Sequence, residues 1–566
     1  MIKAKLQESI MTVLKKLGAN VENVEISYPT HSAQGDFSTN VAFKYARQLN
    51  KNPLEFANEI TKLILKESIN FLEKVQIEKP GFINFWILDS YYLSHLQSIE
   101  KEQIKILPLS LGKQKKIMIE FAHPNTHKLF HIGHLRNISS GESLSRILTV
   151  VGNKVIRSNY QGDVGLHIAK CLWQLGKIVK TKGPDLFKKK TLQEKIALLG
   201  QAYSSGSKAF EEDARAKKEI VEVNKMIYEQ HGDIISLWKE TRQWSLDYFD
   251  SIYARVYTKF DRLYFESEFA ERGKKIIQEA LKKKILVKSK EAVIFDGKKY
   301  GLDTRVFLNA LGIPTYEGKE LALAEKEFSD FGLLDKCMHV VGPEQNSFFK
   351  VTFKVEELLD PKKYKDKQKH LIGGWVRLKH GKMSSRSGVV VEGQWLIDEA
   401  KKKIQEKFNC PDETAEVLAV ASVKYSFLKK GISSEIVFDF DESISLDGNS
   451  APYLIYTYVR TKSVLSKVKN IEQFKITNIN PEEKALLQSL HKFPEVVYES
   501  AKNFSPSIIA NYLYDLAQSY NLFYQKHPIL RASDDLTPFR LVLTKNVGEV
   551  LRRGLDLLGI KTVEKM

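Results

Sequence analysis

One stretch of this 566-residue chain limits its fold more than any other, because it joins three kinds of local structure in a fixed order. Residues 116–121 are a short run typical of a β-strand, residues 122–130 contain Pro124 and Asn125 and cannot be regular, and helical spacing resumes at Leu135. A strand, a loop and a helix in this order place free N–H groups and the positive end of a helix dipole at the carboxyl edge of a parallel sheet. Open α/β sheets bind nucleotides at that edge.

Two histidines stand where the loop enters the helix, in His131-Ile132-Gly133-His134. Three residues apart, they face the same way and can each donate a hydrogen bond to phosphate, while Gly133 has no side chain to block a base or ribose. The alternatives are a zinc pair or two solvated histidines. Zinc would need further ligands, yet the chain has only three cysteines and no Cys-x-x-Cys motif. We therefore expect no metal ligands and no structural zinc.

A second motif lies in residues 381–388, where Gly381 and Gly388 bracket Lys382-Met383-Ser384-Ser385-Arg386. Lysine, arginine and serine hydroxyls together suit a polyphosphate whose charge grows during a reaction. A basic loop of this kind is by itself more often a solvated turn. Together with the first motif, it predicts a nucleotide clamp.

These two motifs resemble the HIGH and KMSKS signatures of class I aminoacyl-tRNA synthetases, and the whole chain resembles the arginyl-tRNA synthetase family. Further matching segments are residues 124–136, 159–165, 244–247, 314–320, 448–454 and 552–566. The resemblance implies ATP-dependent ligation of L-arginine to tRNA(Arg) through an arginyl-adenylate, with release of pyrophosphate and AMP. The alternatives are another class I synthetase and a non-catalytic RNA-binding paralogue; the paralogue would be expected to lose the phosphate histidines.

The hydrophobic patterns divide the chain into three regions. Residues 1–111 combine helical segments with two strand-like runs, which predicts an α+β accessory domain, and the resemblance implies that it touches the tRNA. Residues 112–450 alternate strand and helix patterns, as a Rossmann-type parallel-sheet catalytic domain requires, with a helical insertion at about 170–256. Residues 451–566 lack strand patterns, which predicts an all-α bundle. The resemblance makes this bundle the anticodon-binding domain.

The arginine pocket is predicted partly from chemistry, because a guanidinium is planar and permanently charged and so needs aligned carboxylates and a flat neighbour. Glu266 stands where the family has a guanidinium-binding glutamate. Tyr316 and Glu320 match a family pair one helical turn apart, although the family more often has Asp at the second position. By the same resemblance, Asn125 and Gln345 hold the α-amino and carboxylate groups of the substrate. The predicted arginine-binding residues also include Glu120 and His123, the latter replacing a family serine.

The ATP site and the reacting groups follow from the two motifs. The groups expected to act in catalysis are His131, His134, Lys128, Lys382 and Arg386. Those expected to bind ATP, which would enter with Mg²⁺, are His131, Gly133, His134, Lys382, Met383, Ser384 and Ser385. Ser385 replaces the second lysine of the usual loop. Lys128 matches the position where arginyl enzymes without that lysine carry a compensating one, and Arg386 is its rival.

Composition agrees with a large polyanionic partner, because 87 basic and 69 acidic residues leave a net charge of +18. High basicity can also serve solubility alone. Three scattered cysteines indicate a reducing compartment. No apolar stretch approaches the roughly 18 residues of a membrane span. We expect a monomer in the cytoplasm that binds tRNA(Arg), L-arginine and ATP and has no membrane partner.

Overall fold

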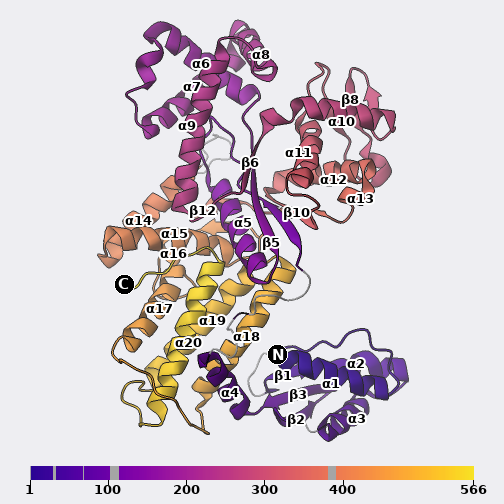
Figure 1. The fold of residues 1–566 in the computed structure, drawn as a ribbon, viewed down its shortest axis with the longest axis vertical. Coiled ribbons are helices and arrows are strands. Elements are labelled where there is room, and N and C mark those ends of the chain that lie inside the picture. Colours follow the sequence, from indigo (N-terminus) through magenta and orange to yellow (C-terminus); the bar gives the residue numbers. More distant parts are fainter. Residues whose placement is uncertain (1, 30–33, 68, 102–106, 108–113, 380–390) are drawn as a thin grey trace. The chain divides into compact units, whose positions relative to one another are not determined.

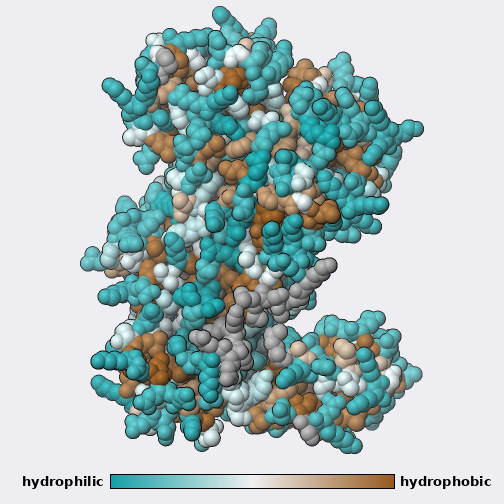
Figure 2. Space-filling view, in the orientation of Figure 1, coloured by the Kyte–Doolittle hydropathy of each residue, from teal (hydrophilic) through white to brown (hydrophobic). Residues whose placement is uncertain are grey.

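The computed structural model describes the chain except for residues 1, 30–33, 68, 102–106, 108–113 and 380–390. The described residues fall into two compact units. The first comprises Met1–Ile106, Val464–Phe493 and Ser519–Val547, and the second comprises Leu107–Ser463, Pro494–Gln518 and Gly548–Met566. Figure 1 colours the elements along the sequence, and the face drawn in Figure 2 is mainly hydrophilic.

The amino-terminal part of the first unit is an α+β structure, as predicted. Its three strands form an antiparallel sheet in the order β1-β3-β2. Asn52 caps the third helix by accepting hydrogen bonds from the N–H groups of Leu54 and Glu55, and Pro53 occupies the first turn, where no N–H is needed. The elements are α1 (Ile2–Lys16), β1 (Phe37–Thr39), α2 (Val41–Ala46), η2 (Arg47–Leu49), α3 (Pro53–Lys66), β2 (Leu72–Glu78), β3 (Phe82–Ile87) and α4 (Asp89–Glu100).

A five-stranded parallel sheet forms the centre of the second unit, which confirms the predicted Rossmann-type body (Figure 1). Its spatial order is β11-β10-β4-β5-β6, and every pairing is parallel. After β4, the strands β5 and β6 extend the sheet on one side, and β10 and β11 then extend it on the other side. The strand order therefore reverses between β4 and β10. Ligands bind at such a switch point. The strands are β4 (Lys116–Glu120), β5 (Lys154–Gln161), β6 (Arg262–Phe265), β10 (Lys336–Val341) and β11 (Gln368–Ile372).

Two insertions interrupt this sheet. The first is helical, as the sequence predicted, and consists of α6 (Leu166–Lys182), η3 (Pro184–Phe187), α7 (Leu192–Glu212), α8 (Ala214–Glu229) and α9 (Ile234–Arg255). The second was not predicted. It is an antiparallel sheet in the order β7-β8-β9, made by β7 (Val287–Ser289), β8 (Ala292–Phe295) and β9 (Arg305–Leu308). It lies between α10 (Ala270–Lys282) and α11 (Tyr316–Asp330) in the chain.

The remaining elements complete the second unit and supply the carboxyl-terminal helices. Within the described residues, no strand follows Phe438, which confirms the predicted all-α region. Most of its aromatic side chains are buried, including Tyr458, Tyr512, Tyr520 and Phe523. No described helix is long and apolar enough to cross a bilayer. The elements are η4 (Glu266–Glu268), η5 (Gly297–Tyr300), η6 (Pro343–Gln345), α12 (Asn346–Leu359), α13 (Pro361–Tyr364), β12 (Val376–Leu378), α14 (Gly393–Phe408), α15 (Asp412–Leu428), β13 (Ile436–Phe438), α16 (Phe440–Ser443), α17 (Ala451–Leu465), α18 (Pro481–Asn503), α19 (Ser507–Lys526) and α20 (Leu536–Leu557).

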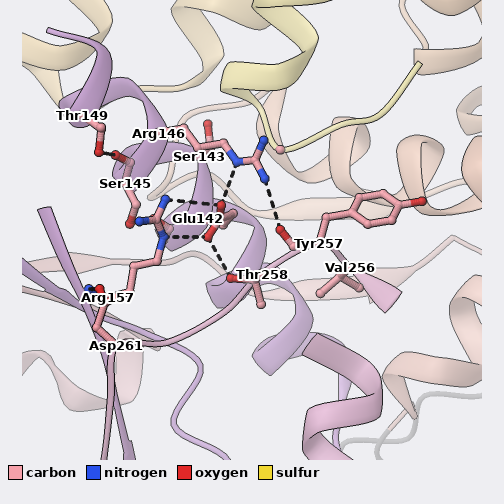
Figure 3. A network of polar contacts seen from close by, with 12 residues as sticks. Glu142, Ser143, Ser145, Arg146, Thr149, Arg157, Val256, Tyr257, Thr258 and Asp261 are labelled. Atoms are coloured by element: carbon pink, nitrogen blue, oxygen red, sulfur yellow. Dashed lines mark hydrogen bonds and ion pairs between the residues drawn. The ribbon is translucent and has the colours of Figure 1, made fainter. Parts of the chain in front are cut away.

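A buried carboxylate, Glu142, joins several of these elements. It lies on α5 (Ile132–Val150), the helix that follows β4. Glu142 accepts hydrogen bonds from Arg146 Nε at 2.7 Å, Arg157 Nε at 3.0 Å and Thr258 Oγ1 at 2.8 Å (Figure 3). Arg146 also contacts Asp556 Oδ1 at 2.6 Å. Because both oxygens of the carboxylate accept hydrogen bonds and Arg146 also reaches Asp556, the network links α5, β5 and the carboxyl-terminal end of α20.

Candidate active site

The two motif histidines form the amino-terminal cap of α5. His131 Nδ1 accepts hydrogen bonds from the N–H groups of Gly133 at 3.1 Å and His134 at 3.4 Å, and His134 Nδ1 accepts the N–H of His131 at 3.2 Å. Their rings are stacked with centroids 3.5 Å apart. A Cβ atom on Gly133 would stand 3.0 Å from the His131 ring, so a larger residue would require this ring to shift. The sequence prediction that both rings face one side is confirmed.

This cap fixes which ring nitrogen of each histidine carries the proton. Burial, reinforced by nearby Lys128, lowers the pKa of His131 to about 4. Burial also lowers the pKa of His134 well below its usual value. Both rings are therefore neutral at pH 7, and because each Nδ1 is an acceptor, the proton lies on Nε2. His131 and His134 therefore each offer one Nε2–H group as a hydrogen-bond donor.

The chain on either side of residues 380–390 is anchored to the same helix and its cap. Ile132 N donates to Val391 O at 3.0 Å, and Gly393 N donates to Phe130 O at 2.8 Å. On the other side, the Arg136 guanidinium donates to Gly374 O at 2.6 Å. The segments that flank the second motif therefore lie against α5 and its cap. Lys382, Met383, Ser384, Ser385 and Arg386 themselves lie outside the described residues.

The loop between β4 and α5 has an unusual backbone. Ala122, His123 and His127 have φ angles of 84°, 54° and 61°, a left-handed region that costs free energy for residues other than glycine. Tertiary contacts hold this conformation: His123 N donates to Asn159 Oδ1 at 3.1 Å, and His127 N donates to Ser245 Oγ at 2.9 Å. Such strain is concentrated at functional sites, where it sets the direction of side chains. Lys128 follows at once, with its ammonium 5.5 Å from the Tyr203 ring centroid.

Asn125 and Glu266 converge on Gly162, although they come from different segments. A Cβ atom at Gly162 would stand 2.1 Å from Asn125 Oδ1 and 3.2 Å from Glu266 Oε2. Thr126 N donates to Gly162 O at 2.9 Å, which fixes the loop on the end of β5. The structure thus brings together two of the predicted arginine-binding residues, and only glycine fits between them.

Glu266 has a partner that the sequence analysis did not predict. Lys319 on α11 donates its ammonium to Glu266 Oε1, and Tyr228 Oη lies 2.9 Å from the same nitrogen. Both members of the ion pair are buried, with exposed fractions of 3% for Lys319 and 8% for Glu266. Burial alone would lower the pKa of Lys319, but Glu266 and Tyr228 outweigh burial and raise it. The ammonium therefore stays charged, leaving Glu266 Oε2 as the oxygen nearest Asn125.

Two further buried carboxylates belong to the predicted pocket. Glu120 Oε1 lies 2.9 Å from His339 Nδ1, and burial, which alone would raise the pKa of Glu120, is outweighed by His339, so that the pKa is lowered. Glu320 Oε1 has no hydrogen-bond partner among the described residues. Burial and then neighbouring Glu120 raise the pKa of Glu320 well above its usual value. The pKa values of the two carboxyl groups are therefore shifted in opposite directions.

The other predicted pocket residues lie close to this group in the fold. Tyr316 begins α11, and its ring centroid is 4.7 Å from that of Phe348 and 6.0 Å from that of Tyr160. Its ring is a flat aromatic surface of the kind that the sequence analysis expects beside a guanidinium. Gln345 ends η6, directly after β10, at the same switch point as the loop after β4.

Asp163, which lies in the matching segment 159–165, supports the pocket. It is fully buried and accepts hydrogen bonds from Ser267 N and Ser267 Oγ, both at 2.8 Å. Arg242 Nε forms an ion pair with Asp163 Oδ2, at 2.9 Å. Burial raises the pKa of Asp163 to about 6, against the opposing effect of Arg242. Asp163 holds the residue after Glu266 and thereby orients that carboxylate.

Comparison with known proteins agrees with this geometry. The family model described as "tRNA synthetases class I (R), catalytic domain" matches residues 95–440. Together with the parallel sheet and its histidine cap, this match defines a class I aminoacyl-tRNA synthetase. Models for the arginyl tRNA synthetase N-terminal domain and the DALR anticodon-binding domain match residues 4–87 and 454–566. The chain belongs to the arginyl-tRNA synthetase family.

Individual relatives cover the whole length. An arginine–tRNA ligase of Parabacteroides distasonis is 32% identical over 609 aligned positions, with 100% of both chains covered. One from Fusobacterium nucleatum is 31% identical, with 96% of this chain and 95% of the relative covered. The solved arginyl-tRNA synthetase of Thermus thermophilus superposes with a TM-score of 0.82 at 24% identity, covering 100% of both chains, and so shares the fold.

Proposed function

We propose that this chain ligates L-arginine to tRNA(Arg) in two steps at the carboxyl edge of its parallel sheet. The arginine carboxylate attacks the α-phosphorus of ATP and pyrophosphate leaves; a ribose hydroxyl of the terminal tRNA adenosine then takes the arginyl group from the adenylate, releasing AMP. The observation that carries the proposal is the meeting of Asn125 and Glu266 at Gly162 on the same sheet edge as the His131–His134 cap. An amino-acid site and a nucleotide site thus share one edge.

In this proposal the histidines bind ATP as neutral donors. Their Nε2–H groups hydrogen-bond the phosphates, and Gly133 lets the nucleotide lie against the start of α5. A neutral donor does not change charge between pH 6 and 8, so the site keeps one electrostatic state during turnover. Lys128 adds a positive charge near both rings, whose pKa values it helps to lower. Preorganised donors of this kind stabilise charge that develops on departing pyrophosphate.

The second motif supplies the other side of the phosphate site. We assign Lys382 and Arg386 to the charge that grows on pyrophosphate, and Met383, Ser384 and Ser385 to contacts with ATP. Support comes from the flanking segments, which are anchored to Ile132 and Arg136. The described groups at the nucleotide motif are hydrogen-bond donors and a cation, which suit phosphate oxygens. Mg²⁺ takes oxygen ligands and would enter bound to ATP, where it neutralises phosphate charge.

The arginine pocket is assigned to the buried carboxylates and the tyrosine. Glu266 Oε2 and Glu320 receive the guanidinium, with Tyr316 beside it. Asn125 and Gln345 bind the α-amino and carboxylate groups, and Glu120 is a further arginine-binding residue. His123, which lies 3.7 Å from Glu120 Oε1, lines the same loop. The guanidinium, as a nearby positive charge, would favour the ionised form of Glu320 and so oppose the effect of burial on its pKa.

We further propose the domain division 1–111, 112–450 and 451–566, with tRNA contacted by the first and its anticodon by the last. The three family models, which match residues 4–87, 95–440 and 454–566, support this division. The net charge of +18 suits an RNA partner. A monomeric state and a cytoplasmic location are part of the proposal, to be checked by light scattering and by cell fractionation.

Pyrophosphate exchange across the amino acids, with and without tRNA(Arg), tests the function. We expect exchange with arginine alone and only when tRNA is present. Exchange with a different amino acid would identify another class I synthetase, and no exchange with any amino acid would identify a non-catalytic RNA-binding protein.

A further inference from the structure

One side of α9, the last helix of the first insertion, lies along the loop that leads to the nucleotide motif. Thr241, Ser245 and Tyr248 are three or four residues apart and therefore share one side of this helix. Thr241 Oγ1 lies 2.8 Å from His127 Nε2, and Ser245 Oγ accepts the N–H of His127 at 2.9 Å. The loop is therefore held against α9 just before it reaches His131.

Two aromatic rings further along the helix pack against the residue before the motif. Phe130 is fully buried, and its ring centroid lies 6.2 Å from that of Phe249 and 6.4 Å from that of Tyr253. The same ring lies 5.0 Å from that of His134 in the histidine cap. Because protein interiors are close-packed, a shift of α9 would displace the ring of Phe130 and with it the cap.

The segment that follows the second motif pairs with the same loop. Two backbone hydrogen bonds, of 3.0 and 2.8 Å, join residues 130–132 to residues 391–393. They flank His131 and Glu392, which stand directly opposite each other in an antiparallel bridge. In a pair of this kind the two backbones come closest, and both side chains leave on the same face. A displacement of Glu392 would therefore displace His131.

Tyr248 connects the helix to this bridge. Tyr248 Oη donates to Glu392 Oε1 at 3.0 Å, and Tyr248 is only 6% exposed. Burial and then Glu392 raise the pKa of Tyr248, against a smaller opposing effect of a backbone hydrogen bond from Phe130, so the hydroxyl keeps its proton and remains a donor. Glu392 directly precedes α14, but its side chain makes no capping hydrogen bond to that helix. The carboxylate therefore binds α9 instead of capping its own helix.

We propose that Tyr248 and Glu392 are positioning residues for nucleotide binding, because their hydrogen bond keeps the backbone of His131 in place for the phosphates. Neither side chain needs to touch the substrate. This role rests on the proposed function in one respect, namely that the His131–His134 cap binds ATP. It goes beyond that function because it makes the helical insertion, through α9, one of the elements that determine the affinity for ATP.

The first experiment measures ATP binding to the full chain by equilibrium titration. Tyr248→Phe removes only the hydroxyl group and Glu392→Leu only the acceptor, so each should weaken ATP binding roughly 10-fold, as expected for one hydrogen bond to a charged group. Because both changes break the same bond, the double variant should bind no more weakly than either single variant. Gln243→Leu is the matched control on α9, since it removes a hydrogen bond to exposed Asp247 and should leave ATP binding unchanged. Wild-type affinity in Tyr248→Phe, or a roughly 100-fold loss in the double variant, overturns the proposal.

Glu392→Gln separates positioning from a general loss of structure. The glutamine keeps an oxygen that accepts the Tyr248 hydroxyl, so its ATP affinity should stay close to that of the wild type. The Michaelis constant for arginine, measured by exchange with tRNA present, should be the same in every variant, whereas partial unfolding would affect both substrates. Glu392→Gln binding as weakly as Glu392→Leu, or equal changes for ATP and arginine, would also overturn the proposal. The titration needs neither amino acid nor tRNA, so a chain that binds ATP but exchanges no arginine refutes the proposed function and leaves this result standing.

Discussion

Lys319 presents its ammonium to the carboxylate of Glu266, so that a cation of the protein already occupies one oxygen of the predicted guanidinium site. The pair is buried, and Tyr228 holds the ammonium from the other side. In the proposed pocket, arginine therefore binds to a carboxylate whose charge is partly compensated. Lysine, with one point charge, would compete for the same position as Lys319, whereas a fork with two donors reaches Glu266 Oε2 and Glu320 together.

Replacing Lys319 with Met should separate these effects. The change leaves a buried carboxylate without its cation and is expected to lower the free energy of unfolding by about 3–5 kcal/mol. Saturating arginine should restore more stability to the variant than to the wild type, because the substrate then supplies the missing charge. Thermal unfolding with and without arginine measures both. An equal arginine-induced shift in both proteins would mean that Lys319 and the substrate do not share Glu266.

Glu266→Gln tests the pocket from the other side. A site built for a charged fork rejects analogues that leave its polar groups unpaired, by up to roughly 10⁴-fold in specificity. We expect arginine to be preferred over lysine and citrulline by the wild type, and the variant to lose arginine use far more than ATP binding. Steady-state exchange in the presence of tRNA gives both Michaelis constants. Similar losses for the two substrates would remove Glu266 from the pocket.

Lys128 is expected to supply the positive charge of the second loop lysine, whose position is occupied by Ser385. If its charge acts on departing pyrophosphate, Lys128→Ala should slow activation by about 10²–10³ with little change in ATP affinity, and adding Ser385→Lys should recover part of the loss. Single-turnover activation of these variants and of Arg386→Ala is the measurement. A Lys128→Ala enzyme that activates at the parent rate would transfer the role to Arg386.

The histidine cap predicts an acid-sensitive fold. The pKa of His131 is lowered from 6.5 to about 4, so the unfolded chain binds a proton in this range that the folded chain does not. The contribution of neutral His131 to the free energy of unfolding is complete above pH 6.5 and is lost as the pH falls toward 4. The loss is about 3 kcal/mol, at 1.36 kcal/mol per pKa unit. His131→Asn keeps an N-cap acceptor without the titration. Urea unfolding at pH 7 and 5 should show a shallower pH slope for this variant; an unchanged slope contradicts the assignment.

Affinity for tRNA should depend steeply on salt, because phosphate neutralisation releases counterions. The Michaelis constant for ATP, bound in a closed site, should change less. Filter binding of tRNA(Arg) between about 50 and 200 mM salt, with parallel exchange kinetics, checks the contrast. A flat tRNA curve would show that the positive charge of the chain does not face the RNA.

The sequence predicted the features that depend on local pattern. The strand, loop and helix around His131 could be read because β4 and α5 have clear periodicities, and the helical insertion because its charged residues repeat along long helices. The β7–β8–β9 sheet was not predicted, because Val287-Lys288-Ser289 is exposed and the other two strands are only four residues long, too short to show an alternation. Short exposed strands carry almost no hydrophobic signal.

Contacts between side chains far apart in the sequence were the other features that could not be predicted. Lys319 lies in the matching segment 314–320, but its pairing with Glu266, 53 residues away, depends on how α11 packs against the segment that follows β6. Asp163 and His339 escaped for the same reason, because a buried polar residue shows its role only through partners from distant segments. Glu320 was found by its spacing from Tyr316, which is a local relation on one helix.

The Glu142 network sets an order of events during synthesis. Arg146 is made 410 residues before Asp556, and Lys424 is made 135 residues before Gly559, whose carbonyl oxygen it contacts. At ribosomal rates of about 5–20 residues per second, α5 exists for tens of seconds before these partners emerge. Until then the ammonium of Lys424 lacks one of its two carbonyl acceptors. All strands of the parallel sheet are therefore synthesised well before these partners, and during that interval the contacts with the carboxyl-terminal segment are missing.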